Sequence, residues 1–132
     1  MNPSSQDVKD MLESSEHGSI GTFATDLFVH EEPASPDACV TVKDTGGFDP
    51  DAGLDYRRPT VQVRIRGPKG DFLTAYTKAL EVRDALHELH NETWNETRYI
   101  GIWQMGDIMD AGNDDNGRPI LTVNFRIHRT TA

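Results

Sequence analysis

Basic residues, cysteine and long hydrophobic runs are all scarce in this chain of 132 residues. The 13 lysines and arginines stand against 22 aspartates and glutamates, which gives a formal net charge of -9. This balance disfavours proteins that hold nucleic acid by neutralising its phosphates. It equally disfavours docking on anionic membrane surfaces, so we expect neither specific nucleic-acid binding nor a membrane partner.

The single cysteine, Cys39, cannot form a disulfide within the chain, and a reducing compartment is expected. No apolar run reaches the roughly 18 residues of a membrane span. Residues 1–16 are polar and lack the hydrophobic stretch of a signal peptide, so we expect synthesis in the cytoplasm. Because Cys39 lies in an apolar segment without a basic neighbour, a buried and inert thiol is favoured over a nucleophile.

Hydrophobic periodicity and turn residues predict one domain that covers residues 1–132. The predicted fold class is α+β: a mainly antiparallel sheet of four or five strands, one long helix packed on a face, and a short N-terminal helix. The expected helices and strands are a helix over 6–14, strands within 23–33, 38–44, 60–66, 98–110 and 120–129, and a helix over 72–90.

Capping and turn residues support several of these boundaries. Ser4 or Ser5 is expected to cap the first helix, and Asp71 the second. Asn116-Gly117 is the strongest hairpin turn in the chain. The stripe of the long helix that packs on the sheet is expected to contain Phe72, Ala75, Tyr76, Ala79, Val82, Leu86 and Leu89.

A loop of about a dozen residues is expected at about 46–58, and loops this long in small domains are usually functional or disordered. Its aspartates, Asp49, Asp51 and Asp55, offer the oxygen ligands that a hard cation prefers. Counted from Asp49, however, the loop lacks the Gly and Glu that an EF-hand requires at its sixth and twelfth positions. A solvated surface loop is therefore favoured, with no metal, no cofactor and no catalytic residue expected.

Four arginines within ten residues stand out in this acidic chain: Arg57, Arg58, Arg64 and Arg66. The planar guanidinium pairs with carboxylates and is enriched in protein interfaces. These arginines, with the loop aspartates as their counterparts, are candidates for a head-to-tail contact between copies of the chain. On spacing alone, an equally good interpretation is that the arginines keep the exposed face of the sheet soluble.

Three motifs occur in order over roughly residues 25–129. The first is a Pro-x-x-Pro-Asp turn that leads into a strand ending in Thr-Gly-Gly (33–47). The second is Pro-x-Val-Gln-Val-Arg-x-Arg-Gly with a following Tyr-x-x-Ala (59–79). The third is an Asp-x-Asn-Gly-Arg turn ahead of an Asn-Phe strand (114–125). Together they resemble the tail-terminator and minor capsid protein family of long-tailed bacteriophages.

The resemblance implies a structural protein of the virion tail or neck, without enzymatic activity and made in the host cytoplasm. Proteins similar to this form a hexameric ring that stops tail-tube polymerisation and presents the surface to which the DNA-filled head attaches. The implied partners are further copies of the chain, the tail-tube protein, a head connector or stopper protein, and genome DNA that passes through the lumen without specific binding.

Three alternatives remain open at this point. The family also covers head-completion and connector proteins of the neck, which have a similar size. A metal-dependent enzyme that uses the acidic loop at 46–58 is a second alternative. A small adaptor or inhibitor that binds a basic host protein through the negative surface is the third.

Overall fold

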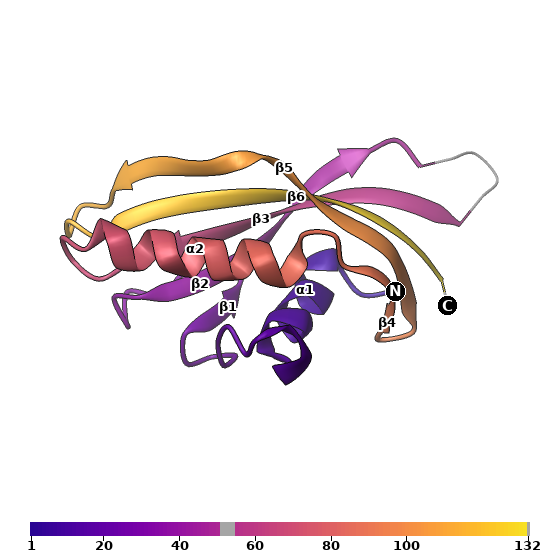
Figure 1. Cartoon of the computed structure of the whole chain (residues 1–132), viewed down its shortest axis with the longest axis horizontal. Helices are drawn as coiled ribbons and strands as arrows, with labels where there is room; N and C mark the ends of the chain where they lie inside the picture. Colours follow the sequence, from indigo (N-terminus) through magenta and orange to yellow (C-terminus); the bar gives the residue numbers. More distant parts are fainter. Residues whose placement is uncertain (51–54, 132) are drawn as a thin grey trace.

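The computed structural model describes residues 1–50 and 55–131, which fold into two helices, a short 3-10 turn and a six-stranded sheet (Figure 1). The bounds are α1 (Ser4–Glu13), η1 (Ser15–His17), β1 (Leu27–Val29), β2 (Cys39–Phe48), β3 (Tyr56–Arg66), α2 (Phe72–Leu86), β4 (His90–Trp94), β5 (Thr97–Asn113) and β6 (Pro119–Thr131). The predicted α+β class is therefore confirmed, with a long helix and a short N-terminal one.

The sheet differs from the prediction in size and in direction. Its order is β1-β2-β3-β6-β5-β4, so it has six strands instead of four or five. Neighbouring strands are antiparallel except β1, which runs parallel to β2. The sheet is therefore mixed. A strand of three residues such as β1 is too short for its pairing direction to be read from alternation.

The end of α2 explains why β4 was not predicted. The helix stops at Leu86 instead of residue 90, because Glu88 adopts a left-handed backbone with φ 67°. The backbone nitrogen of Glu88 then donates to the carbonyl of Ile102 on β5, at 2.8 Å. The helix is thus four residues shorter than predicted, and residues 90–94 form an edge strand ahead of the strand expected within 98–110.

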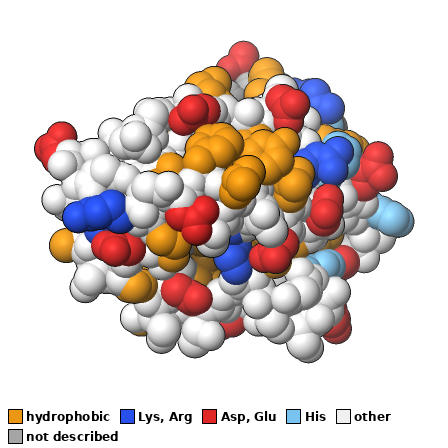
Figure 2. Space-filling model, turned by 60° about the vertical axis from the view of Figure 1, so that its left-hand side comes forward, with side chains coloured by type: hydrophobic (Ala, Val, Ile, Leu, Met, Phe, Trp, Pro, Cys, Tyr) orange, Lys and Arg blue, Asp and Glu red, His pale blue; other side chains and the backbone are white. Residues whose placement is uncertain are grey.

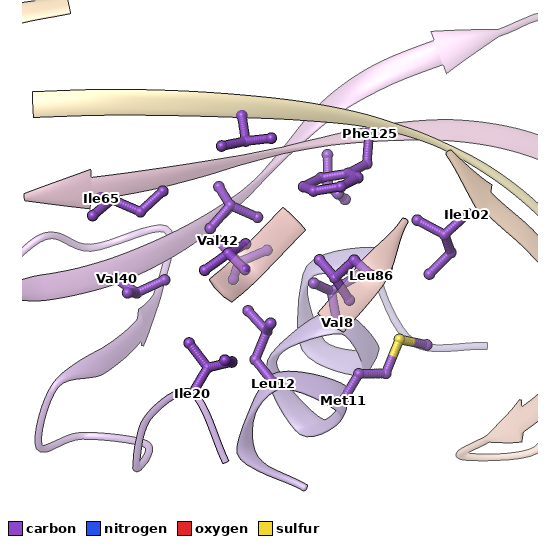
Figure 3. Packing of buried hydrophobic residues seen from close by; sticks show 14 of the residues in the cluster. Val8, Met11, Leu12, Ile20, Val40, Val42, Ile65, Leu86, Ile102 and Phe125 are labelled. Carbon is purple, nitrogen blue, oxygen red and sulfur yellow. The ribbon is translucent and has the colours of Figure 1, made fainter. Parts of the chain in front are cut away.

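Both helices lie on one face of the twisted sheet, and the hydrophobic core fills the space between them (Figure 1, Figure 3). The predicted apolar stripe of α1 is confirmed, since Val8, Met11 and Leu12 are fully buried. The alternation predicted for β3 and β6 is also confirmed. The apolar side chains that these two strands bury on the core side are Val61, Val63, Ile65, Leu121, Val123, Phe125 and Ile127.

The stripe predicted for α2 is only partly right. Ala75, Ala79, Val82 and Leu86 face the sheet and are buried, and so is Leu89 beyond the helix end. Phe72 and Tyr76 are instead exposed, and their rings stack on each other outside the core. The buried stripe of the helix is therefore narrower than predicted.

The strands β2 and β3 extend into the segment predicted as a loop. β2 continues to Phe48 and β3 begins at Tyr56, so the connection between them is shorter than 46–58. Gly47 makes this pairing close, because a Cβ there would lie 2.5 Å from the carbonyl oxygen of Arg58. Residues 51–54 lie outside the described part of the chain.

Candidate functional site

Two of the four candidate interface arginines, Arg64 and Arg66, make hydrogen bonds within their own chain. Arg66 is 3% exposed, and its guanidinium donates to the carbonyl oxygens of Asp37 and Pro36 at 2.8 and 2.7 Å. Arg64 donates through Nε to Glu32 at 2.8 Å. These two residues therefore fasten the segment before β2 to the sheet. Burial removes Arg66 from the surface that a neighbour can reach, which corrects the expectation for this residue.

The other two arginines lie at the far end of the β2–β3 strand pair. Arg57 is exposed, and its Nε lies 3.8 Å from a carboxylate oxygen of Asp55. Arg58 donates to the carbonyl oxygen of Asp49 at 2.8 Å. The structure thus brings four of the predicted residues together on one projecting strand pair, while Asp51 lies outside the described residues. Asp49, Asp55 and Arg57 are exposed there, and Arg58 is half-buried.

The turn between β5 and β6 carries a second buried arginine, Arg118. Its Nε donates to a carboxylate oxygen of Asp114 at 2.7 Å, and its Nη1 donates to the carbonyl oxygen of Ala34 at 2.6 Å. Hydrogen bonds from the backbone nitrogen and the guanidinium of Arg118 hold the pKa of Asp114 below its ordinary value. The Asp-x-Asn-Gly-Arg motif is therefore a structural clamp between this hairpin and the segment before β2.

Asp55, one of the loop aspartates considered for a cation, and Asp44, which lies just before the loop, are both engaged with protein groups. Asp44 accepts hydrogen bonds from the backbone nitrogen of Ser5 and from His30, at 2.9 and 2.7 Å. Asp55 accepts one from the backbone nitrogen of Thr131 at 3.1 Å. In the described residues these aspartates join segments far apart in the sequence, and their oxygens do not converge on a common point.

A different group of potential metal ligands does converge. Ligand atoms of Glu16, His17 and Glu92 all lie within 4.8 Å of one another. One oxygen of Glu92 already accepts hydrogen bonds from His17 and from the indole nitrogen of Trp94, each at 2.9 Å. This cluster therefore connects η1 to β4 through hydrogen bonds that need no ion.

An aromatic and basic cluster occupies the sheet face that carries no helix. The ring of His128 lies edge-on to those of Trp103 and Tyr56, with centroids 4.9 and 5.5 Å away. The guanidinium of Arg126 lies over Trp103 at 5.5 Å. Gly101 makes room for the indole, because a Cβ there would lie 2.3 Å from it. The sequence analysis missed this cluster, although Trp103, Arg126 and His128 fall at alternate strand positions.

The sequence analysis also did not predict the exposed apolar side chains on the outer face of α2. Leu73 is 75% exposed, and Phe72, Tyr76 and Leu80 are exposed beside it. Figure 2, in which the end of the molecule on the left of Figure 1 comes forward, shows hydrophobic side chains gathered in one patch among acidic and basic ones. Leu73 and Leu80 are seven residues apart and lie outside the buried stripe, and this spacing could have predicted a second apolar face on the helix.

Cys39 is a free and buried cysteine, as predicted. Burial raises the pKa of its thiol, although Arg66 and Arg118 act in the opposite direction. A thiol with a raised pKa carries little thiolate at neutral pH. Cys39 therefore packs as a small hydrophobic residue.

The fold, a twisted sheet with helices on one face, is shared with a chain of a solved structure. A chain of a solved structure titled "Virion of native gene transfer agent (GTA) particle" matches with a TM-score of 0.75 over 96% of this chain and 93% of that chain. The sequence identity is 15%, so this likeness concerns the fold. No curated protein matches the sequence significantly.

Residues 16–131 match the model of the family described as "Bacteriophage tail terminator protein". The chain belongs to this family, and the resemblance carried by the three sequence motifs is confirmed. It is therefore a structural protein of the virion tail. Within residues 1–50 and 55–131, no helix is long and apolar enough to cross a membrane.

Proposed function

We propose that this chain forms a ring at the head-proximal end of the phage tail, where it stops polymerisation of the tail tube and provides the surface for head attachment. The observation that carries the proposal is the family match over residues 16–131. A single small α+β domain with two distinct exposed surfaces, one on α2 and one on the sheet, suits a protein whose role is contact with others of its kind.

The charge of the chain supports passage of DNA through such a ring. Six copies at -9 each would carry about -54. A strongly negative lumen repels the phosphate backbone, so the genome can slide past without adhering. Binding of DNA is therefore not part of the proposed role, and neither is a cofactor, a metal ion or an enzymatic reaction.

The projecting β2–β3 strand pair is proposed as a contact with a neighbouring virion protein. Arg57 and Arg58 lie there beside Asp49 and Asp55, so both signs of charge are exposed at one place. Mixed charges of this kind fix the register of a contact more than its affinity. The tail-tube protein below the ring and the head connector or stopper protein above it are the proposed partners.

Polymerisation of the tail-tube protein encoded with this chain tests the proposal. Tubes are assembled with and without the purified chain, and their lengths are measured by electron microscopy. We expect shorter tubes with a ring of this chain at one end. Tubes of unchanged length with bare ends, together with binding to the head alone, would instead establish a connector role in the neck.

A further inference from the structure

The helix-free face of the sheet carries several large apolar and aromatic side chains. Strand register places Trp103 opposite Arg126, Met105 opposite Asn124, and Met109 opposite Thr122. Residues paired across antiparallel strands point to the same side of a sheet. Met109 is 58% exposed and Met105 is exposed beside the aromatic cluster. We call Trp103, Met105, Met109 and Arg126 the sheet surface.

On β2, β3 and β6 the charged side chains on this side are basic, in a chain that is acidic overall. On β2, β3 and β6, the charged side chains that share the side of Arg126 are Lys43, Arg58, Arg64, Arg66 and Arg126. Arg64 and Arg66 pair with Glu32 at one end, as described above. The exposed part of the sheet surface therefore combines apolar area with positive charge.

The outer face of α2 has the opposite character. Leu73, Tyr76 and Leu80 form an exposed apolar stripe. On the same face, nearer the end of the helix, lie the exposed carboxylates of Glu81 and Asp84. The side chain of Asp84 is 71% exposed. We call these five residues the helix surface. Its apolar part matches the methionines and Trp103 in kind. Its two carboxylates lie 3.3 and 3.2 Å from Lys78 and Arg83 on the same helix, and they remain exposed to meet the positive charge of Arg126.

We propose that the helix surface of one copy docks on the sheet surface of a second copy. This inference rests on the proposed ring and names its seam. The two surfaces lie on opposite layers of one chain, so each copy offers one of each and the contact repeats head to tail. Repeated contacts of this type close into a ring when the rotation between copies allows it. Trp, Tyr and Arg are the side chains that most often dominate such interfaces.

The parts of β2 and β5 that extend beyond the short edge strands β1 and β4 are poorer candidates for the seam. β2 has a bulge between Asp44 and Gly47, and β5 has bulges between Met105 and Met109 and between Asp110 and Asn113. Bulges twist an edge and interrupt its row of hydrogen-bonding groups, which discourages addition of another strand. The faces of the two layers are therefore the better candidates for the contact.

Two single variants test the seam from its two sides. Leu73→Glu places a charge in the helix surface, and Met109→Glu places one in the sheet surface; both positions are exposed, so the fold is expected to persist. Thr93→Glu, at an exposed position on β4 outside both surfaces, is the matched control. The mass in solution is measured by sedimentation and native mass spectrometry, and circular dichroism verifies folding.

We expect the wild type and Thr93→Glu to form the same oligomer, and each seam variant alone to be a monomer. The association constant should fall at least about 30-fold, as for loss of one dominant interface residue. A mixture of the two seam variants should form a heterodimer and nothing larger. Met109→Glu keeps its helix surface and Leu73→Glu keeps its sheet surface, so one intact seam remains.

The other outcomes overturn the inference, and they distinguish failure of the proposed seam from failure of the proposed ring. If both variants still form the wild-type oligomer, the ring stands but its seam lies elsewhere. If only Leu73→Glu dissociates, the helices of two copies pack on each other, or α2 serves another partner, and the head-to-tail contact is wrong. If the wild type is monomeric in solution and absent from tube ends, the ring itself fails and the inference fails with it.

Discussion

Asp44 on β2 accepts hydrogen bonds from both the backbone nitrogen and the hydroxyl of Ser5, at 2.9 and 2.5 Å. The helix α1 needs this contact, because its N-cap residue is Pro3 and no side chain of α1 caps its own first turn. A carboxylate at the start of a helix satisfies free N–H groups and faces the positive end of the helix dipole. The expectation that Ser4 or Ser5 caps α1 was therefore wrong, and the cap comes from the sheet.

Replacing Asp44 with Asn should lower the free energy of unfolding by about 1–2 kcal/mol at neutral pH, the usual cost of losing a helix cap. Burial raises the pKa of Asp44, but hydrogen bonds from Ser5 and His30 outweigh it, so the pKa lies below its ordinary value. The stabilisation is therefore present above the ordinary aspartate pKa and is lost as the pH falls through the lower folded value.

Chemical denaturation of the wild type and Asp44→Asn over a range of pH measures this effect. The difference between the two proteins should shrink in acid as the wild-type carboxylate is protonated. Asp115→Asn, at an exposed turn position, is the control and should change little. A difference that stays constant down to the lowest pH would contradict the role of the charged carboxylate.

Local patterns in the sequence were enough to predict the elements whose own residues determine them. The alternation of Val61, Val63 and Ile65 gave β3, and the spacing of Val8, Met11 and Leu12 gave α1. The parts that could not be predicted depend on contacts between distant residues. Asp44 lies 39 positions from Ser5, and α2 ends where Glu88 meets Ile102 on another strand. No local pattern contains either relationship.

The candidate interface residues also divide into those that local sequence predicts and those that depend on distant contacts. Clustering of Arg57, Arg58, Arg64 and Arg66 in the sequence suggested one basic interface, whereas the fold buries Arg66 and pairs Arg64 with Glu32. Which arginine faces a neighbour depends on where the segment before β2 crosses the sheet. That path is fixed by hydrogen bonds between residues about thirty positions apart, so composition alone could not decide it.

Arg66→Met should loosen the segment before β2 and lower the free energy of unfolding by about 1.5–3 kcal/mol, the range for hydrogen bonds to a charged group. Amide hydrogen exchange should accelerate over 31–38, because the carbonyl groups of Pro36 and Asp37 lose their donor. Arg66→Lys keeps the charge but not the planar fork, so it should recover only part of the protection. Unchanged exchange in Arg66→Met would show that the hydrogen bonds of Arg66 do not hold this segment on the sheet.

Gly101→Ala should displace the indole of Trp103, because the new Cβ would lie 2.3 Å from the ring. Overpacking of this kind costs about 1–3 kcal/mol. Tryptophan fluorescence should change with it. In a Trp103→Ala background the same substitution should be tolerated, since the space is then empty. Equal costs in both backgrounds would mean that the backbone, and not the indole, requires glycine at this position.

Tyr99→Phe should destabilise the protein by about 1–3 kcal/mol, because it deprives a buried carboxylate of a donor. Tyr99 donates its hydroxyl hydrogen to Asp7, which is fully buried on α1. Asn95 also donates to Asp7 at 2.7 Å, and Arg129 lies 3.9 Å from it. The loss of Tyr99 therefore leaves the charge with fewer partners, and α1 should detach from the sheet more easily.

The stability difference between wild type and Tyr99→Phe should also depend on pH, which gives a second measurement of the same contact. Burial, and then Asp7, raise the pKa of Tyr99 above the ordinary tyrosine value. A raised pKa means that the folded state favours the protonated phenol, so its contribution is present below the ordinary pKa and is lost as the pH rises toward the folded value. The stability gap between wild type and Tyr99→Phe should therefore narrow in alkali. In an Asp7→Asn background the gap should be smaller at every pH, and an unchanged gap there would show that the hydroxyl acts independently of Asp7.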